Sequence, residues 1–388
     1  MRRAVERARL AVAVAFAANG VAFASWVSRT PAVRDALSLT KTELGLLLLC
    51  ASLGSLAALP LSGALVHRLG PARTVLGGGG AVSAGLLLAA AGLSRADVAL
   101  TAVGLALVGL GISAWDVAMN VEGADVERRL DRPLMPRFHA AFSIGTVLGA
   151  LLGAGAAATV VGVEAQLVVT AVVVLVAVAA AVRAFLAVER TGDAPTRSLL
   201  AQAWREPRTL LIGLMVLAFA FTEGTANDWL ALTVVDGLGA SEALGALGFG
   251  VFVAAMTLGR TVGGSALRHY GRVPVLRTSA LVALVGLLLV VFGPSLAWVL
   301  TGAAVWGLGT ALGFPVGMSA GADDPHRAAL RVSVVSSIGY TAFLVGPPLV
   351  GFLADAVGVR RSLLVVVVAL IVALLTAARA REPVAAGA

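Results

Sequence analysis

The chain has 388 residues, of which 59% are hydrophobic and only 13% are charged. Soluble globular domains carry about 25% charged residues, so this composition indicates a protein that lies largely in lipid. The formal net charge of +8 does not indicate nucleic-acid binding, because the arginines fall in loops that flank apolar runs.

The residue inventory excludes several chemistries. Cys50 is the only cysteine and the four histidines lie far apart, so neither an internal disulfide nor a metal site is expected. The single lysine, Lys41, has no glycine-rich loop before it, which excludes a P-loop ATPase. We therefore expect no cofactor and no enzymatic activity.

Twelve continuously apolar runs follow one another along the chain, and such runs are typical of membrane-spanning helices. Because the runs do not alternate, they exclude a β-barrel. The first run has Arg2 and Arg3 before it and resembles a signal peptide, but eleven further runs favour a retained helix. The runs are 8–27, 44–66, 74–93, 98–122, 138–160, 166–182, 209–235, 243–267, 274–292, 296–319, 331–354 and 362–378.

Lysine and arginine gather on one side of the expected spans. The N-terminus, the loops from even-numbered to odd-numbered spans and the C-terminus hold most of them. The opposite side holds a minority: Arg29, Arg34, Lys41, Arg95, Arg360 and Arg361. Because cytoplasmic loops are enriched in these residues, we expect both termini in the cytoplasm and the spans in the inner membrane.

The chain also contains an internal repeat. The sequence G-L-G at 109–111 precedes G-A-D at 123–125, and the same two triplets recur with the same spacing at 307–309 and 321–323. Repeated halves are typical of secondary transporters, which bind substrate between the repeats near the middle of the bilayer.

The repeat predicts an all-α integral membrane protein of twelve transmembrane helices in two pseudo-symmetric six-helix halves. The halves are expected at 1–187 and 209–388, joined by a cytoplasmic linker at 188–208. We expect a monomer whose partners are a small-molecule substrate, protons and the lipid bilayer.

The loop after the second span carries a recognisable signature. From Gly63 to Arg73 it reads G-A-L-V-H-R-L-G-P-A-R, which resembles the major facilitator superfamily signature G-x-L-x-D-R-x-G-R-R. Gly63, Arg68, Gly70 and Arg73 match, whereas His67 stands where the family has an aspartate. The resemblance implies the twelve-helix fold of that superfamily and a loop that takes part in gating.

Three further segments resemble the fucose-permease-like branch of this superfamily. They are D-V-A-M-N at 116–120, H-A-A-F-S-I-G at 139–145 and E-G-T-A-N-D-W at 223–229. The resemblance implies that Asp116 serves proton coupling and sugar recognition. The aspartate that this branch carries on its first helix has no counterpart, because Val27 occupies that position.

Ionisable and amide side chains within spans are candidate substrate-binding and proton-binding residues, because they are costly in lipid. Asp116 and Asn120 are four residues apart and share one face of the fourth span. Glu223 and Asn227 repeat this spacing on the seventh span, with Asp228 rotated away from them. The alternative is a structural carboxylate tied to a neighbouring helix or, for Asp228, to a loop arginine.

Five further residues complete the candidate set. Asn19 lies in the middle of the first span, and His139 lies where the fifth begins, as a proton relay or a simple anchor. Trp26, Trp115 and Trp229 would stack on a sugar ring, or else pack or anchor at the membrane interface.

Other charged residues are expected outside the site. Arg260 is expected near the cytoplasmic end of the eighth span, where it snorkels or forms an ion pair, with contact to the substrate as the alternative. Glu122 and Glu127 are expected to join Arg128 and Arg132 in a cytoplasmic charge cluster.

Glycines predict close helix packing and local unwinding. Gly145, Gly149 and Gly153 form G-x-x-x-G steps, which let two helix backbones approach closely. Gly224 is expected to allow local unwinding of the seventh span.

These observations favour a proton-coupled symporter of a small polar solute, a sugar or sugar-like compound, that works by alternating access. Protonation of Asp116 or Glu223 would neutralise a buried charge and permit the conversion between the two states of alternating access. The alternative is a proton-antiporting exporter of drugs or metabolites. A third hypothesis, from another class, is a sensor or assembly partner that transports nothing.

Overall fold

A computed structural model describes residues 2–130, 134–159, 161–186, 202–324 and 327–382. Regular structure in these ranges is helical throughout, and 12 helices are long and apolar enough to cross a membrane. The chain is therefore an all-α multi-pass membrane protein, and the spans expected from the apolar runs are confirmed.

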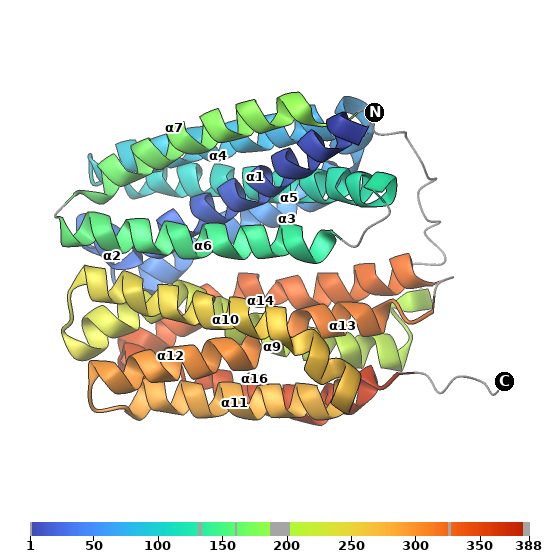
Figure 1. Cartoon of the computed structure of the whole chain (residues 1–388). Coiled ribbons are helices and arrows are strands. Elements are labelled where there is room, and N and C mark those ends of the chain that lie inside the picture. Colours follow the sequence, from blue (N-terminus) through green and yellow to red (C-terminus); the bar gives the residue numbers. More distant parts are fainter. Residues whose placement is uncertain (1, 131–133, 160, 187–201, 325–326, 383–388) are drawn as a thin grey trace. The chain divides into compact units, whose positions relative to one another are not determined.

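The chain forms two compact units (Figure 1). The first is Met1–Thr191 with Ala231–Gly250, and the second is Gly192–Leu230 with Val251–Ala388. The short stretch 231–250 therefore packs with the first unit, although it belongs to the seventh and eighth spans. Most of the expected linker, 188–201, lies outside the described residues.

The helices of each unit run side by side (Figure 1). The first half of the chain forms α1 (Arg2–Val27), α2 (Thr30–Ala36), α3 (Lys41–Leu69), α4 (Pro71–Leu93), α5 (Val98–Leu130), α6 (Met135–Ala158), α7 (Val163–Ala181) and the 3-10 turn η1 (Val182–Ala184). The second half forms α9 (Pro207–Leu238), α10 (Glu242–Tyr270), α11 (Arg272–Phe292), α12 (Leu296–Thr310), α13 (Gly313–Gly321), α14 (Ala328–Val357), α15 (Val359–Ser362), α16 (Val365–Thr376) and the 3-10 turn η2 (Ala377–Ala380).

Single glycines make the tightest turns between spans. Gly70 separates α3 from α4 and Gly271 separates α10 from α11, with φ angles of 80° and 76°. Residues with a side chain rarely adopt such angles, so glycine is required where two helices must reverse within one residue. The two turns occupy equivalent places in the two halves, which supports the internal repeat.

Close glycine contacts recur at the same place in both halves. A Cβ added to Gly104 of α5 would lie 2.7 Å from the carbonyl oxygen of Gly85 on α4. In the second half, a Cβ added to Gly302 of α12 would lie 2.8 Å from the carbonyl oxygen of Gly286 on α11. These helix pairs therefore cross with their backbones in contact, as small residues allow in membranes.

The G-x-x-x-G steps of α6 pack against α1. Added Cβ atoms at Gly145 and Gly153 would lie 2.0 Å from the carbonyl oxygen of Ala17 and 2.2 Å from Oγ of Ser28. Gly149, between them, would meet α1 in the same way. The packing role expected for these glycines is confirmed.

Two expectations about helix continuity were wrong. The helix α9 is continuous from Pro207 to Leu238, so Gly224 does not unwind it. The absent side chain instead leaves room for the ring of Phe343, which an added Cβ would approach to 3.1 Å. The tenth span, by contrast, is broken between Thr310 and Gly313, where α12 gives way to α13.

Candidate substrate and proton site

The carboxylate of Asp116 is held by an amide on its own helix. Asn120, one turn further along α5, donates from Nδ2 to the backbone carbonyl of Asp116 at 2.9 Å and to Oδ1 at 3.3 Å. Both residues are partly exposed although they lie well inside the span. The i, i+4 spacing of the sequence thus produces a real contact, which fixes the direction of the carboxylate.

The other polar candidates of the first unit have different surroundings. Asn19 on α1 is 1% exposed, and its Nδ2 has no acceptor among the described residues. His139 is exposed at the start of α6, and its ring lies edge-on to Phe16 at 5.2 Å. The side chain that bonds to Asp116 is Asn120, on the same helix.

In the second unit, Glu223 forms an ion pair with Arg260. Nη2 of Arg260, on α10, lies 3.1 Å and 3.2 Å from the two carboxylate oxygens of Glu223, on α9. Nε of the same arginine donates to the carbonyl oxygen of Ala311 at 3.3 Å. The ion pair considered for Arg260 is present, but it lies within the span and not near its cytoplasmic end, because α10 and α9 pack so that Arg260 reaches Glu223.

Two polar neighbours of Glu223 on α9 have no partner among the described residues. Asn227 is 8% exposed, and its Oδ1 receives no hydrogen bond. Asp228 is partly exposed and forms neither an ion pair nor a hydrogen bond within the described ranges. No loop arginine in the described ranges pairs with Asp228.

The three candidate tryptophans are buried. Trp115 and Trp229 are 0% exposed and Trp26 is 5% exposed, so none lies in contact with the lipid interface as an exposed anchor. Each indole N–H lacks an acceptor among the described residues. Trp115 also fills the space that Gly78 leaves, since a Cβ there would lie 2.8 Å from the Cβ of Trp115.

The expected gating loop is shorter than the sequence suggested. The helix α3 continues through Gly63 to Leu69, so the connection to α4 consists of Gly70 alone. Arg68 and Arg73 are exposed and have no polar partner among the described residues. The corresponding end of the second unit differs, because its loop arginine is fully engaged.

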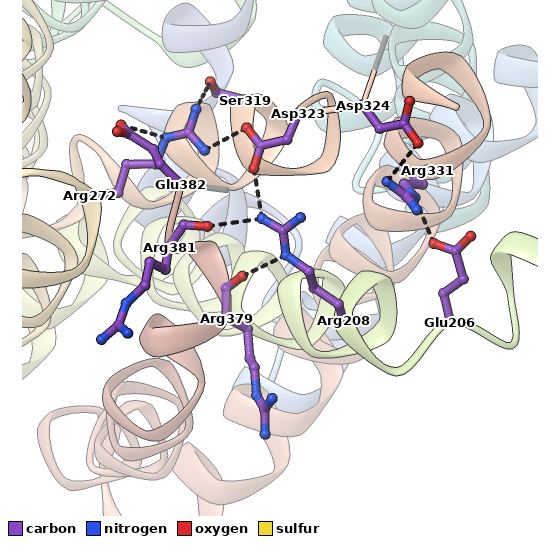
Figure 2. Close-up of polar contacts among 10 residues, drawn as sticks. All are labelled: Glu206, Arg208, Arg272, Ser319, Asp323, Asp324, Arg331, Arg379, Arg381 and Glu382. Atoms are coloured by element: carbon purple, nitrogen blue, oxygen red, sulfur yellow. Dashed lines mark hydrogen bonds and ion pairs between the residues drawn. The ribbon is translucent and has the colours of Figure 1, made fainter. Parts of the chain in front are cut away.

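This engaged arginine is Arg272, directly after the Gly271 turn (Figure 2). It donates to Oδ1 of Asp323 at 2.7 Å and to Oγ of Ser319 at 3.1 Å. Arg208 donates to Oδ2 of the same aspartate at 2.7 Å and also to the backbone carbonyls of Arg379 and Arg381. Asp323, the last residue of the second G-A-D triplet, thus joins the ends of four helical spans.

A second ion cluster lies beside it (Figure 2). Glu206, just before α9, accepts from Arg327 at 2.7 Å and from Arg331 at 2.6 Å. Burial alone would raise the pKa of Glu206, but hydrogen bonds from Arg331, Thr209 and Arg327 outweigh it and hold the pKa below its ordinary value. The cluster therefore ties the start of α9 to the start of α14.

Two of the acidic residues at the end of α5, Glu122 and Glu127, bind backbone groups, whereas the buried Asp125 between them pairs with Arg128 and Arg129. This helix runs to Leu130, past the expected end at 122. Glu122 accepts the N–H of Leu186, and Glu127 accepts the N–H groups of Leu134 and Met135 at the start of α6. Arg128 therefore belongs to a charge cluster at this end, but its partner is Asp125, and no ion pair joins it to Glu122 or Glu127 within the described ranges. Arg132 lies outside the described residues.

The sequence also concealed a network at the opposite end of the first unit. Arg29 is 4% exposed, donates to Oε1 of Gln166 at 2.9 Å and lies 3.3 Å from Oε2 of Glu242. Arg34 is paired with Asp236. The only signal in the sequence was Arg29, directly after the first apolar run, and an arginine at such a place is typical of an ordinary loop.

Twelve apolar helices with carboxylates in the middle of spans define the class of multi-pass membrane transporters. The profile of the Major Facilitator Superfamily matches residues 10–232 and 212–387, which together cover nearly the whole chain. The protein therefore belongs to the Major Facilitator Superfamily. The resemblance seen in the loop after the second span is confirmed at the level of the family.

Curated relatives span almost the full length of the chain. The uncharacterized transporter y4wD of Sinorhizobium fredii is 34% identical over 353 residues, covering 90% of this chain and 92% of the relative. Membrane protein MosC of Rhizobium meliloti is 30% identical over 364 residues, covering 92% and 86%. A Yersinia pestis transporter named as MFS-type is 28% identical over 347 residues, covering 88% of both chains.

Solved transporter structures share the fold. The nucleoside transporter NupG aligns with a TM-score of 0.75 at 12% identity, covering 96% of this chain and 98% of its own. The transporter FucP in its outward conformation aligns with a TM-score of 0.69 at 15% identity, covering 97% and 99%. A bacterial homologue of the lysosomal transporter Spinster aligns with a TM-score of 0.75 at 14% identity, covering 99% and 100%. At such identities the likeness establishes the fold alone.

Proposed function

We propose that this protein is a proton-coupled symporter that imports a small polar solute, a sugar or sugar-like compound, by alternating access. It acts as a monomer in the inner membrane, with both termini in the cytoplasm. Membership of a family of transporters supports the general activity. The likeness to FucP, a fucose:proton symporter of E. coli, is compatible with sugar and proton as cargo.

The observation that carries the proposal is the Asp116–Asn120 pair. A carboxylate in the middle of a span costs free energy in the membrane, so such groups usually have a function. The carboxylate of Asp116 is partly exposed and is oriented by the Asn120 amide. A carboxylate can take up and release a proton, and an amide can donate to and accept from hydroxyl groups of a solute. The pair therefore combines proton binding with recognition of a polar molecule.

The test is the internal pH of proteoliposomes that contain the full-length protein. Neutral sugars, organic acids and cationic drugs would be added outside in turn. Proton symport predicts acidification with one class of compound and its loss in Asp116→Asn. Alkalinisation would instead indicate the antiporting exporter, and no pH change with any compound would contradict proton coupling.

A matched control is Asp97→Asn. Oδ1 of Asp97 accepts the N–H of Leu100 at 3.0 Å, at the start of α5. Asparagine caps a helix about as well as aspartate. This variant therefore removes one carboxylate at the start of the helix that carries Asp116, and the protein should still fold. It should transport as the wild type does.

A further inference from the structure

One guanidinium joins three spans in the interior of the second unit. Arg260 lies about 15 Å along the helix axis from the end of α10 at Tyr270, and Glu223 lies near the midpoint of α9. The third contact is the carbonyl of Ala311, in the break between α12 and α13. A helix break leaves carbonyl groups without their usual donors, and Arg260 supplies one.

The ion pair is incomplete as a structural element. The side chains of Arg260 and Glu223 remain 31% and 19% exposed. Both carboxylate oxygens contact the same nitrogen, Nη2, whereas the strongest arginine–carboxylate pairs use two parallel N–H bonds from different nitrogens. The described residues offer Nη1 no acceptor. Nη1 is therefore free to donate to a second carboxylate.

A polar group without a partner lies beside this pair. Asn227 follows Glu223 by one helical turn, which places their side chains on the same face of α9. Its Oδ1 is buried and receives no hydrogen bond from the described residues. Buried acceptors are nearly always satisfied, so this oxygen calls for a donor such as a hydroxyl group.

We propose that Arg260 binds the carboxylate of a hydroxylated substrate, that Asn227 accepts a hydrogen bond from one of its hydroxyl groups, and that Glu223 occupies the guanidinium when no substrate is present. The inference rests on the proposed transport function and narrows the substrate to a sugar acid or a similar hydroxylated carboxylate. A planar, two-nitrogen fork is the group best suited to a carboxylate, which is why arginine and not lysine fits this place.

The exchange of carboxylates on Arg260 requires a proton. When the substrate takes the guanidinium, Glu223 loses the one charged side chain that contacts it. The other elements packed nearby contribute the Phe343 ring, close to Gly224, and the carbonyl of Ala311, while Asp228 on its own helix adds further negative charge. An ionised Glu223 would then be an uncompensated charge, so a proton binds its carboxylate oxygen. One monoanion and one proton move together, and transport is electroneutral.

The test measures equilibrium binding of radiolabelled D-glucuronate, with D-glucose as the neutral counterpart, to the purified full-length protein. Glu223→Gln removes the competing carboxylate, so it should bind glucuronate at least about tenfold more tightly than the wild type at pH 7.5. Binding to the wild type should strengthen as the pH falls, whereas binding to Glu223→Gln should not. Arg260→Gln and Arg260→Lys should each weaken glucuronate binding at least about tenfold at pH 5.5, because neither offers the fork.

Two variants guard against misfolding as the explanation. The double variant Glu223→Gln with Arg260→Gln leaves no unpaired charge, so it should fold and yet fail to bind glucuronate. Arg268→Gln removes an exposed arginine two turns further along α10 and should bind as the wild type does. Equal glucuronate binding by wild type, Glu223→Gln and Arg260→Gln would overturn the proposal, as would no binding to any of them.

Failure of this inference is distinguishable from failure of the proposed function. If neutral sugars acidify the proteoliposomes and glucuronate neither binds nor enters, proton symport stands and the role of Arg260 is wrong. If glucuronate binding depends on Arg260 but no compound moves protons, the anion site stands and symport is wrong. Glucuronate uptake that responds to an imposed membrane potential would contradict the electroneutral exchange.

Discussion

Asp116, Glu223 and Asp228 lie within membrane-spanning helices, and each has a different neighbour. Asp116 is bonded to an amide, Glu223 is paired with an arginine, and Asp228 has no polar partner among the described residues. Replacing the carboxylate should therefore affect stability differently at each of the three positions.

Removing Arg260 should destabilise the protein more than removing the charge of Asp228. Arg260→Ala leaves Glu223 as an unpaired charge within a span, which should lower the free energy of unfolding toward the lower end of about 3–5 kcal/mol, because the pair is partly exposed. Asp228→Asn breaks no contact and should change it by less than about 1 kcal/mol. Chemical unfolding in detergent measures both, and similar losses would contradict this assignment of partners.

Among the elements, α1 and α6 pack with their backbones in contact, and the glycines of α6 make this packing testable. Gly145→Ala would place a methyl group against the carbonyl of Ala17, so it should destabilise by about 1–3 kcal/mol. Gly155 lies on the same helix with nothing within 4 Å of an added Cβ. Gly155→Ala should therefore be neutral or stabilise by up to about 1 kcal/mol, through helix propensity. Thermal unfolding of the two variants compares them, and a loss in both would indicate a general intolerance of α6.

The ion cluster that ties α9 to α14 should make the second unit sensitive to acid. The pKa of Glu206 is lowered in the folded state relative to its ordinary value of 4.5, so its contribution is fully present above that pH and is lost as the pH falls through the folded value. The thermal midpoint should therefore drop as the solution is acidified below about pH 4.5. Glu206→Gln should flatten part of this decline, and an unchanged pH profile in the variant would contradict the role of Glu206.

For the whole molecule, the even number of spans among the described residues predicts both termini on one side of the membrane, and the arginine distribution predicts that this side is the cytoplasm. Cys50→Ser provides a background without cysteine. In it, Arg95→Cys, between α4 and α5, should react with a membrane-impermeant maleimide in intact cells, and Arg205→Cys, before α9, should react only after permeabilisation. The reverse pattern would invert the orientation.

The sequence by itself determined the features that belong to a single helix or a single turn. Lengths of apolar runs gave the twelve spans, because a run of that length must satisfy its own backbone hydrogen bonds in lipid. The i, i+4 spacing brought Asn120 within hydrogen-bond distance of Asp116, and the glycine spacing predicted close packing of α6, which contacts α1. These follow from the fixed period of the helix, which needs no knowledge of its neighbours.

Only the tertiary structure decided which charges meet. Arg260 and Glu223 are 37 residues apart, and Arg208 and Asp323 are 115 apart, so their pairing depends on how the helices are rotated and in what register they pack. The same holds for the break of the tenth span at Ala311, whose carbonyl bonds to an arginine from another helix. Hydropathy records that a side chain lies in lipid or in a loop, and it does not record which side chain from another helix will face it.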